Sequence, residues 1–222
     1  MTYPIFSLKK QHEALQAKLT KAFHRVLASG AFILGPEVEA WEKEFGDFIG
    51  AKHSVGVSSG SDALLLALQT LGVGPGDEVI VPTYTLFASA GSVARLGARS
   101  VGKECVCEAT SRGDSAENAS WLLPFRCRPS HTFNQFEVRT PGAGKRDRLR
   151  EALQTKNVGT KVYDPRPLHV QECFRDLGYR EGDFPWAEEF SRETLALPIY
   201  PELETKELEQ AASELARLVP TL

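Results

Sequence analysis

The sequence has no apolar run long enough to cross a lipid bilayer, and its N-terminus lacks a basic segment followed by an apolar one. We therefore expect a cytoplasmic protein without membrane contacts. Neither sign of charge is in surplus: 26 Lys and Arg stand against 29 Asp and Glu, a formal net charge of −3. This balance argues against a polyanionic partner such as nucleic acid.

Cysteine is also scarce. The chain has four cysteines, and their spacings match neither a paired CxxC zinc site nor a dense disulfide framework. We interpret them as free thiols and predict no metal site. They are Cys105, Cys107, Cys127 and Cys173.

The overall amino-acid composition is that of an ordinary globular protein. Of 222 residues, 42% are hydrophobic and 25% are charged, which allows one large domain or two small ones. The first hundred residues alternate between helical and extended patterns, and this predicts an α/β fold. We expect helices at 11–28, from 36 to between 46 and 50, at 63–71 and at 87–96, with strands at 53–58, 78–82 (buried) and from 97.

The alternation stops after Val101. Residues 101–132 show no sustained period of two or 3.6, so we expect an irregular connecting segment. Beyond it, the pattern predicts a β-α-β unit, an extended proline-containing stretch and two helices. The strands of the unit are expected at 133–139 and 158–163, with a helix at 145–156 between them. The extended stretch is expected at 164–167. The last two helices are expected at 185–195 and 204–218, and the second of them has Leu208, Ala212, Leu215 and Leu218 on its apolar face.

A short turn, 58–63, joins the strand expected at 53–58 to an apolar helix. The first N–H groups of a helix have no internal partner and carry partial positive charge, and Gly60 would let an anion approach the backbone. The turn therefore suits phosphate. The small residues could equally serve only to cap the helix. It is not a Walker loop, because no Gly-Lys-Ser/Thr follows.

The run HSVGVSSGSDALLLALQTLGVGPGDEVIVPTYTLFASAGSVARLG, residues 53–97, resembles the DegT/StrS family of pyridoxal-phosphate-dependent sugar aminotransferases. GAFILGPEVEAWEKEFGDFIGAKH before it, and FNQFEVR, KNVGTKVYDPRPLHVQECFRDLGY and LALPIYPEL after it, are similar to other parts of that family. The resemblance implies a partial aspartate-aminotransferase-like α/β fold (fold type I). It also implies pyridoxal 5′-phosphate as cofactor, a nucleotide-linked keto sugar and an amino donor as substrates, and a homodimer.

The implied domains follow the resemblance. Residues 1–100 would be the N-terminal part of the cofactor-binding large domain, with an incomplete sheet. Residues 101–132 would connect it to a small α+β C-terminal domain at 133–222.

The resemblance also assigns site residues. Gly60, Ser61 and Asp62 fall where family members hold the cofactor phosphate. Tyr84 lies in the PTYTLF segment, which matches the segment of the family that contacts the cofactor. In the family an aromatic residue of this segment stacks on the pyridine ring, and Leu86 occupies its place here. The alternative interpretation of the aromatic side chains in this segment is that they pack in the core. Tyr163 and His169 match the segment that faces the sugar, although a histidine after two prolines is otherwise a surface residue.

The family's catalytic groups have no counterpart in the sequence. The acid that pairs with the pyridine nitrogen, the Schiff-base lysine and a Gly-Tyr-Asn segment all belong to the part that residues 101–132 replace. Lys103 lies in a lone Ser-x-x-Lys pattern and is expected to be a surface lysine, and no catalytic residue is assigned. The sequence thus predicts an internally deleted or truncated family member that is inactive alone. A non-catalytic subunit of an intact relative and a nonfunctional product of gene rearrangement are the alternatives.

Overall fold

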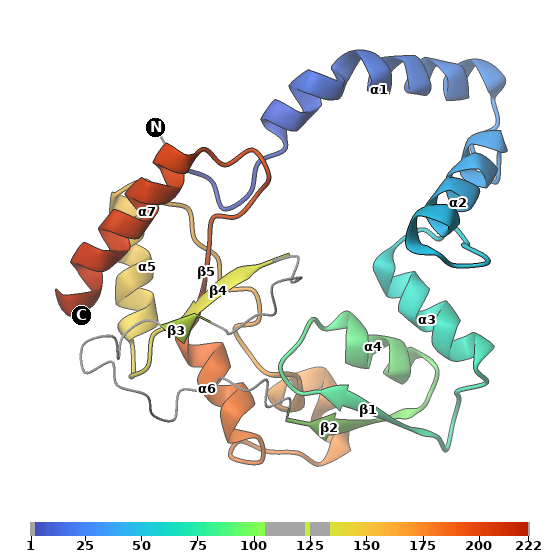
Figure 1. Cartoon of the computed structure of the whole chain (residues 1–222). Helices are drawn as coiled ribbons and strands as arrows, with labels where there is room; N and C mark the ends of the chain where they lie inside the picture. Colours follow the sequence, from blue (N-terminus) through green and yellow to red (C-terminus); the bar gives the residue numbers. More distant parts are fainter. Residues whose placement is uncertain (1–2, 105–122, 125–133, 222) are drawn as a thin grey trace.

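The computed structural model describes residues 3–104, 123–124 and 134–221, arranged as Figure 1 shows. Its helices are α1 (Lys9–Ser29), α2 (Pro36–Ile49), α3 (Gly60–Thr70), α4 (Ala88–Arg95), α5 (Lys145–Thr155), α6 (Pro185–Glu193) and α7 (Thr205–Leu218). Its strands are β1 (Glu78–Pro82), β2 (Arg99–Lys103), β3 (Leu123–Pro124), β4 (Phe136–Arg139) and β5 (Thr194–Leu197), and short 3₁₀ helices are η1 (Leu168–Val170), η2 (Glu172–Leu177) and η3 (Val219–Thr221).

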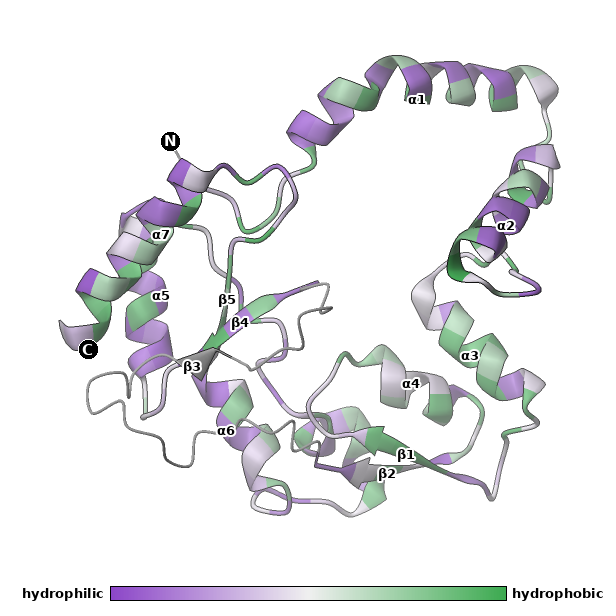
Figure 2. Cartoon of the chain, in the orientation of Figure 1, coloured by the Kyte–Doolittle hydropathy of each residue, from purple (hydrophilic) through white to green (hydrophobic). Residues whose placement is uncertain are grey.

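Helices α1, α2 and α3 form an arm that leads from the C-terminal half of the structure round to β1 (Figure 1). Helix α1 ends where Gly30 adopts a left-handed conformation with φ 66°, which costs glycine little because it has no Cβ. Pro36 opens α2, since its fixed φ and missing N–H suit the first turn of a helix. No residue of α1 or α3 is buried, and Figure 2 shows polar and apolar residues side by side along these helices.

The strands β1 and β2 form a parallel pair, with Glu78 opposite Arg99, and α4 is the crossover between them. Their core also receives side chains from the C-terminal half, because η1 and η2 pack against it. The buried residues of this core are Val81, Ala90, Val93, Ala98, Leu168 and Phe174.

The strands β3, β4 and β5 form an antiparallel sheet in that order, and α5 and α7 pack beside it. A capping box at Glu204 and Glu207 fixes the start of α7. The core between these elements is the better buried of the two: Leu149, Leu153 and Leu195 are 0% exposed. Val138, Val158, Leu197, Ala211 and Leu215 complete it.

Most elements expected from the sequence are present within a few residues of their predicted bounds. These are α1 to α5, α7, β1, β2 and β4. The parallel pairing of β1 with β2 confirms the α/β character of the first hundred residues. Within the described residues, no helix combines the length and the hydropathy that a membrane span needs.

The strand predicted at 53–58 is wrong. The segment is extended but pairs with no strand: the N–H of Gly56 donates to the side chain of Glu42 at 2.6 Å, and Val55 is 76% exposed. A strand needs a neighbour to satisfy its backbone groups, and none of the described strands lies beside this segment.

The β-α-β unit predicted at 133–163 is also wrong in its second strand. Val158 and Lys161 make isolated bridges to two different partners, Tyr3 and Ala196, so no ladder forms. The sheet partner of β4 is instead β5, which contains Leu195, a residue expected in the preceding helix. Helix α6 ends earlier because Thr194 is already extended, with ψ 144°.

Two expected burial patterns differ in detail. Ile80 in β1 is 72% exposed, because the two-stranded pair is covered on one face only. The buried residues of α7 are Ala211 and Leu215, whereas Leu208 is 56% exposed and Ala212 is also exposed. Of the irregular segment expected at 101–132, β2 takes the first residues up to Lys103, and most of the remainder lies outside the described residues.

We predict that Leu153→Ala lowers the free energy of unfolding by about 2–5 kcal/mol, because it leaves a cavity in a fully buried site. Leu208→Ala is the matched control and should cost less than about 0.5 kcal/mol, since Leu208 is 56% exposed. Urea unfolding followed by circular dichroism measures both. Equal effects of the two substitutions would contradict the assignment of this core.

Candidate functional site

The N-terminus of α3 has the geometry expected for the 58–63 turn. Ser59 is the N-cap, and its Oγ accepts the N–H of Asp62 at 3.1 Å while its carbonyl accepts the N–H of Ala63 at 2.9 Å. Within the described residues, the N–H groups of Gly60 and Ser61 donate to no protein acceptor. A Cβ at Gly60 would meet nothing within 4 Å, so this end of the helix is open. The predicted helix start is therefore confirmed.

The hydroxyls of this turn are directed at Asp62. Ser58 and Ser59 donate to its Oδ2 at 2.5 and 2.9 Å, and Arg95 of α4 lies 3.5 Å from its Oδ1. The hydrogen bonds from Ser58 and then Ser59, with a smaller effect of Arg95, hold the pKa of Asp62 below its usual value. The groups free to meet an anion are thus backbone N–H groups, and the residues that carry them do not line the cavity beside His169.

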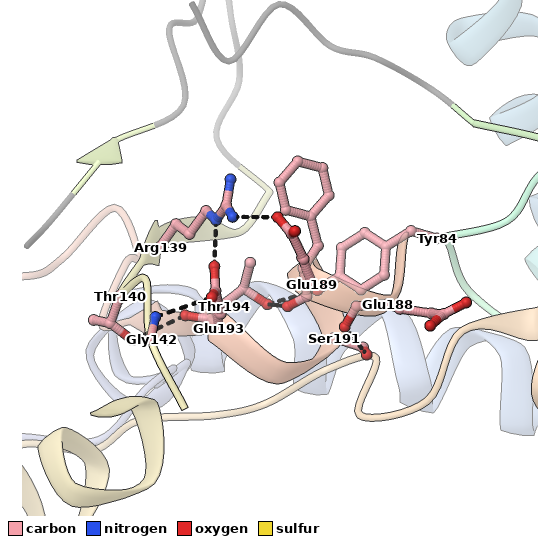
Figure 3. Close-up of polar contacts among 10 residues, drawn as sticks. Tyr84, Arg139, Thr140, Gly142, Glu188, Glu189, Ser191, Glu193 and Thr194 are labelled. Atoms are coloured by element: carbon pink, nitrogen blue, oxygen red, sulfur yellow. Dashed lines mark hydrogen bonds and ion pairs between the residues drawn. The ribbon is translucent and has the colours of Figure 1, made fainter. Parts of the chain in front are cut away.

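Tyr84 is directed at the C-terminal half of the structure. Its hydroxyl lies 2.6 Å from Oγ1 of Thr194, and its ring lies 5.8 Å from that of Phe190 (Figure 3). Burial, and next the charge of Glu137, raise the pKa of Tyr84. Leu86 is 67% exposed and lies just before α4. Tyr84 therefore joins the two halves of the chain.

His169 and Tyr163 occupy different environments. Tyr163 is 38% exposed, whereas His169 is 3% exposed and its Nε2 lies 3.0 Å from Oε1 of Glu188. Burial acts to raise the pKa of Glu188, but hydrogen bonds from Gly182 N–H and from His169 hold it below its usual value. The alternative interpretation, a surface histidine after two prolines, is therefore wrong, since η1 turns the side chain of His169 inward.

A cavity of about 590 Å³ opens beside His169. Its walls come from the proline-containing stretch, η2, the loop that follows and α6. Four arginines and three glutamates are among its lining residues, so it is polar and of mixed charge. They are Arg166, Arg175, Arg180, Arg192, Glu172, Glu181 and Glu188.

An ion-pair network between β4 and α6 was not expected from the sequence. Arg139 donates to Glu189 at 2.6 Å and to Glu193 at 2.5 Å, and its guanidinium lies 5.3 Å from the ring centre of Phe190 (Figure 3). The N–H of Gly142 also donates to Glu193, at 3.0 Å. The spacing of the two glutamates, one helical turn apart, is the signal in the sequence that indicates a common partner.

Two carboxyl groups that interact with Tyr84, those of Glu137 and Asp164, have pKa values above their usual range. Burial, and then the Asp164 carboxylate, raise the pKa of Glu137, and burial raises the pKa of Asp164. Tyr84 interacts with both. Shifted pKa values of this kind occur at functional sites and also in structural clusters.

All eleven lysines lie in the described residues, and none of them is buried. Lys145 and Lys156 are half-buried and the others are exposed, including Lys103 at the end of β2. In the part of the chain that the structure describes, no group of three potential metal ligands occurs.

We predict that Glu137→Gln raises the thermal unfolding midpoint at pH 7 by a few degrees, on the order of 2–5 °C. A carboxyl whose pKa is raised on folding costs stability as pH rises from its unfolded pKa through its folded pKa. The difference should therefore vanish near pH 3.5, where the carboxyl is protonated in both states. The exposed Glu209→Gln is the control, and an unchanged or lower midpoint for Glu137→Gln at pH 7 would contradict the shift.

The chain is similar in sequence to several known proteins. The chain is 51% identical over 98 residues to dTDP-3-amino-3,4,6-trideoxy-alpha-D-glucose transaminase of Streptomyces venezuelae, a match that spans 44% of this chain and 26% of that protein. It is 24% identical over 368 residues to the pleiotropic regulatory protein of Geobacillus stearothermophilus, spanning 97% of this chain and 98% of that protein. Because the chain has only 222 residues, the missing length lies inside that aligned span.

The X-ray structure of S. venezuelae DesV in complex with a ketimine intermediate has the same fold, with a TM-score of 0.81 at 24% identity and 98% of each chain covered. The fold is thus a partial aspartate-aminotransferase-like α/β fold, with an incomplete large-domain sheet and a small α+β C-terminal domain. Pyridoxal 5′-phosphate is the cofactor that this resemblance indicates. The model of the DegT/DnrJ/EryC1/StrS aminotransferase family matches residues 13–105 and 116–216, and the chain belongs to that family.

Proposed function

We propose that the chain is a reduced nucleotide-sugar aminotransferase that retains a contact for the cofactor phosphate but has no aminotransferase activity by itself. Relatives at 51% and 47% identity over parts of the chain are named as aminotransferases of dTDP- and UDP-linked sugars, which supports the substrate class. The observation that carries the lack of activity is the set of eleven lysines, none of which is buried.

The residues present fit the phosphate end of the cofactor. The open N-terminus of α3 offers the N–H groups of Gly60 and Ser61 and the positive end of the helix dipole. The Asp62 carboxylate accepts hydrogen bonds from the hydroxyls of Ser58 and Ser59, and these bonds order the turn. We assign Gly60, Ser61 and Asp62 to phosphate binding.

The residues present do not fit the ring end. Leu86 is aliphatic and 67% exposed, and the hydroxyl of Tyr84 is held by Thr194. When bound in an aminotransferase, pyridoxal phosphate supplies an electron sink for the carbon atom that gains or loses an amino group. That chemistry requires a lysine that is held in place with a lowered pKa, and an acid beside the pyridine nitrogen. No step through the cofactor is therefore assigned to this chain.

For the substrate, we propose the region around Tyr163 and His169. The cavity of about 590 Å³ beside His169 has the size of a small-molecule site and the arginines that a nucleotide phosphate or an amino donor's carboxylate would need. His169 is a positioning residue there, since its bond to Glu188 fixes its ring.

A second candidate function is a non-catalytic partner of an intact family member. The observation that favours it is the exposed apolar surface of α1, α2 and α3, where Phe48 is 85% exposed and Phe23 is 65% exposed. Exposed apolar surface on this scale marks an interaction site. The relative aligned over 97% of this chain is named as a regulatory protein, which fits such a role. Copurification with a full-length relative would discriminate this candidate from an independent chain.

The same proposal includes the domain division, the cellular location and the oligomeric state of the chain. The domains are residues 1–100 and 133–222 with a connection at 101–132, the chain acts in the cytoplasm, and it forms a homodimer.

We predict that borohydride reduction with pyridoxal phosphate labels no single lysine stoichiometrically and that the chain shows no transamination of keto sugars. Exposed lysines react slowly and without selectivity, because no surrounding groups of the described structure hold the aldehyde against one of them. Peptide mapping by mass spectrometry locates the label. Stoichiometric labelling of one lysine, abolished by its replacement with alanine, would overturn the proposal and identify the catalyst.

We predict that Gly60→Asp weakens pyridoxal phosphate binding at least tenfold in equilibrium dialysis, since a carboxylate would occupy the place of the phosphate. The substitution should leave folding intact, because a Cβ there meets nothing within 4 Å and an acid suits the first turn of a helix. Thr205→Asp, at the first residue of α7, is the matched control. Equal binding by the parent and Gly60→Asp, or no binding by the parent, would remove the phosphate assignment.

A further inference from the structure

We propose that a small cavity between the two halves of the chain binds one water molecule, held by Ser100, His169 and Tyr179. We call it the junction cavity. Its walls come from β1, β2 and α4 of the N-terminal half and from η1, η2 and Tyr179 of the C-terminal half. Its volume is about 20 Å³, and about 10–15 Å³ is enough for one water molecule.

Two buried polar atoms in residues that line the junction cavity have no hydrogen-bond partner in the described part of the chain. They are Oγ of Ser100 and Nδ1 of His169, in residues that are 5% and 3% exposed. Elsewhere in the described residues, only Glu202 holds another such atom. Buried polar groups of folded proteins are almost always hydrogen-bonded, either to protein or to ordered water. Two unpartnered atoms at one cavity therefore indicate a shared partner inside it.

The hydrogen bond of His169 to Glu188 determines what its Nδ1 atom needs. Burial acts to raise the pKa of Glu188, but the N–H of Gly182 and His169 hold it below its usual value, so Glu188 is a carboxylate. A carboxylate only accepts, and Nε2 of His169 lies 3.0 Å from its Oε1, so Nε2 carries the proton. In a neutral ring Nδ1 is then an acceptor. The partner in the junction cavity must donate a hydrogen bond to Nδ1, which a water molecule can do.

Two hydroxyl groups complete the site. Ser100 lies opposite Val79 in the parallel pair, on the face that packs against η1 and η2. The hydroxyl of Tyr179 accepts the N–H of Gly102 at 3.1 Å, which leaves its own proton to donate. A water that accepts from these two hydroxyls and donates to Nδ1 of His169 makes about three hydrogen bonds, the usual number for a buried water.

A water in this position has two effects on the molecule. It links β2 to η1 and to Tyr179, so it adds polar contacts to the apolar packing that joins the two halves. It also fixes the tautomer of His169, because the hydrogen bond at one ring nitrogen decides which nitrogen carries the proton. His169 lines the cavity of about 590 Å³ as well, so the water orients a ring that faces both cavities. The inference does not depend on what the larger cavity binds.

The test counts long-lived water molecules in the full chain by magnetic relaxation dispersion of the water oxygen nuclei. Ser100→Val replaces the hydroxyl by methyl groups that occupy the junction cavity, and a β-branched residue suits a strand. We expect this variant to lose one long-lived water relative to the parent. Ser92→Ala is the matched control and should keep the parental count, since Ser92 is 2% exposed but its hydroxyl donates to the carbonyl of Ala88 at 2.7 Å.

Nitrogen NMR of the His169 ring provides a readout that packing alone would not move. At pH 8 the parent should carry its proton on Nε2 and show a hydrogen-bonded Nδ1. The Nδ1 signal should move to that of a nitrogen without a hydrogen bond in Ser100→Val and stay unchanged in Ser92→Ala. If circular dichroism shows that Ser100→Val does not fold, a cross-relaxation peak between water and the methyl groups of Val81 in the parent tests the same cavity.

Equal counts of long-lived water in the parent and in folded Ser100→Val would overturn the inference. A proton on Nδ1 of His169 in the parent, or no water peak at the Val81 methyl groups, would also overturn it. Xenon found in the junction cavity of a crystal under xenon pressure would identify a dry apolar cavity instead. None of these results bears on the phosphate contact proposed at Gly60, which does not line the junction cavity.

Discussion

The parallel pair β1–β2 depends on one contact, the packing of η1 and η2 against it. A two-stranded sheet with one short helix buries too little apolar surface to be stable alone. Leu168 and Phe174 complete its core, and the N–H of Leu168 donates to the carbonyl of Thr83 at 2.9 Å. This segment of the C-terminal half thus completes the core of the strand pair, and it holds the two halves of the molecule together.

The same contact also positions residues that the family resemblance assigns to the site. Because η1 turns inward, His169 is buried against Glu188, and Tyr84 reaches Thr194 of β5. Gly60, which we propose as the phosphate contact, opens α3, and the Ser92 hydroxyl of α4 donates to the carbonyl of Ser61 in α3 at 3.3 Å. Gly60 does not line the cavity beside His169, and none of the lysines is buried.

The arm shows the other consequence of the missing length. Helices α1 and α3 have the amphipathic patterns of packed helices, yet the described structure buries none of their residues. Local propensity and capping are sufficient to specify these helices. Burial of their apolar sides requires neighbouring elements, which local signals do not provide.

The sequence by itself determined the elements whose signals are local. The caps at Gly30 and Ser59, the proline that opens α2 and the alternation through β1, α4 and β2 each depend on residues close in the chain. The motif SGSDA located the start of α3 for the same reason.

Only the tertiary structure decided which extended segments become strands, because a strand is defined by a partner that lies far away in sequence. Residues 53–58 have an extended pattern and no neighbour, while Thr194–Leu197, expected as the end of a helix, pair with β4. The burial of His169, the pair it makes with Glu188 and the network around Arg139 also join elements distant in the chain. Their formation depends on packing that no local pattern encodes.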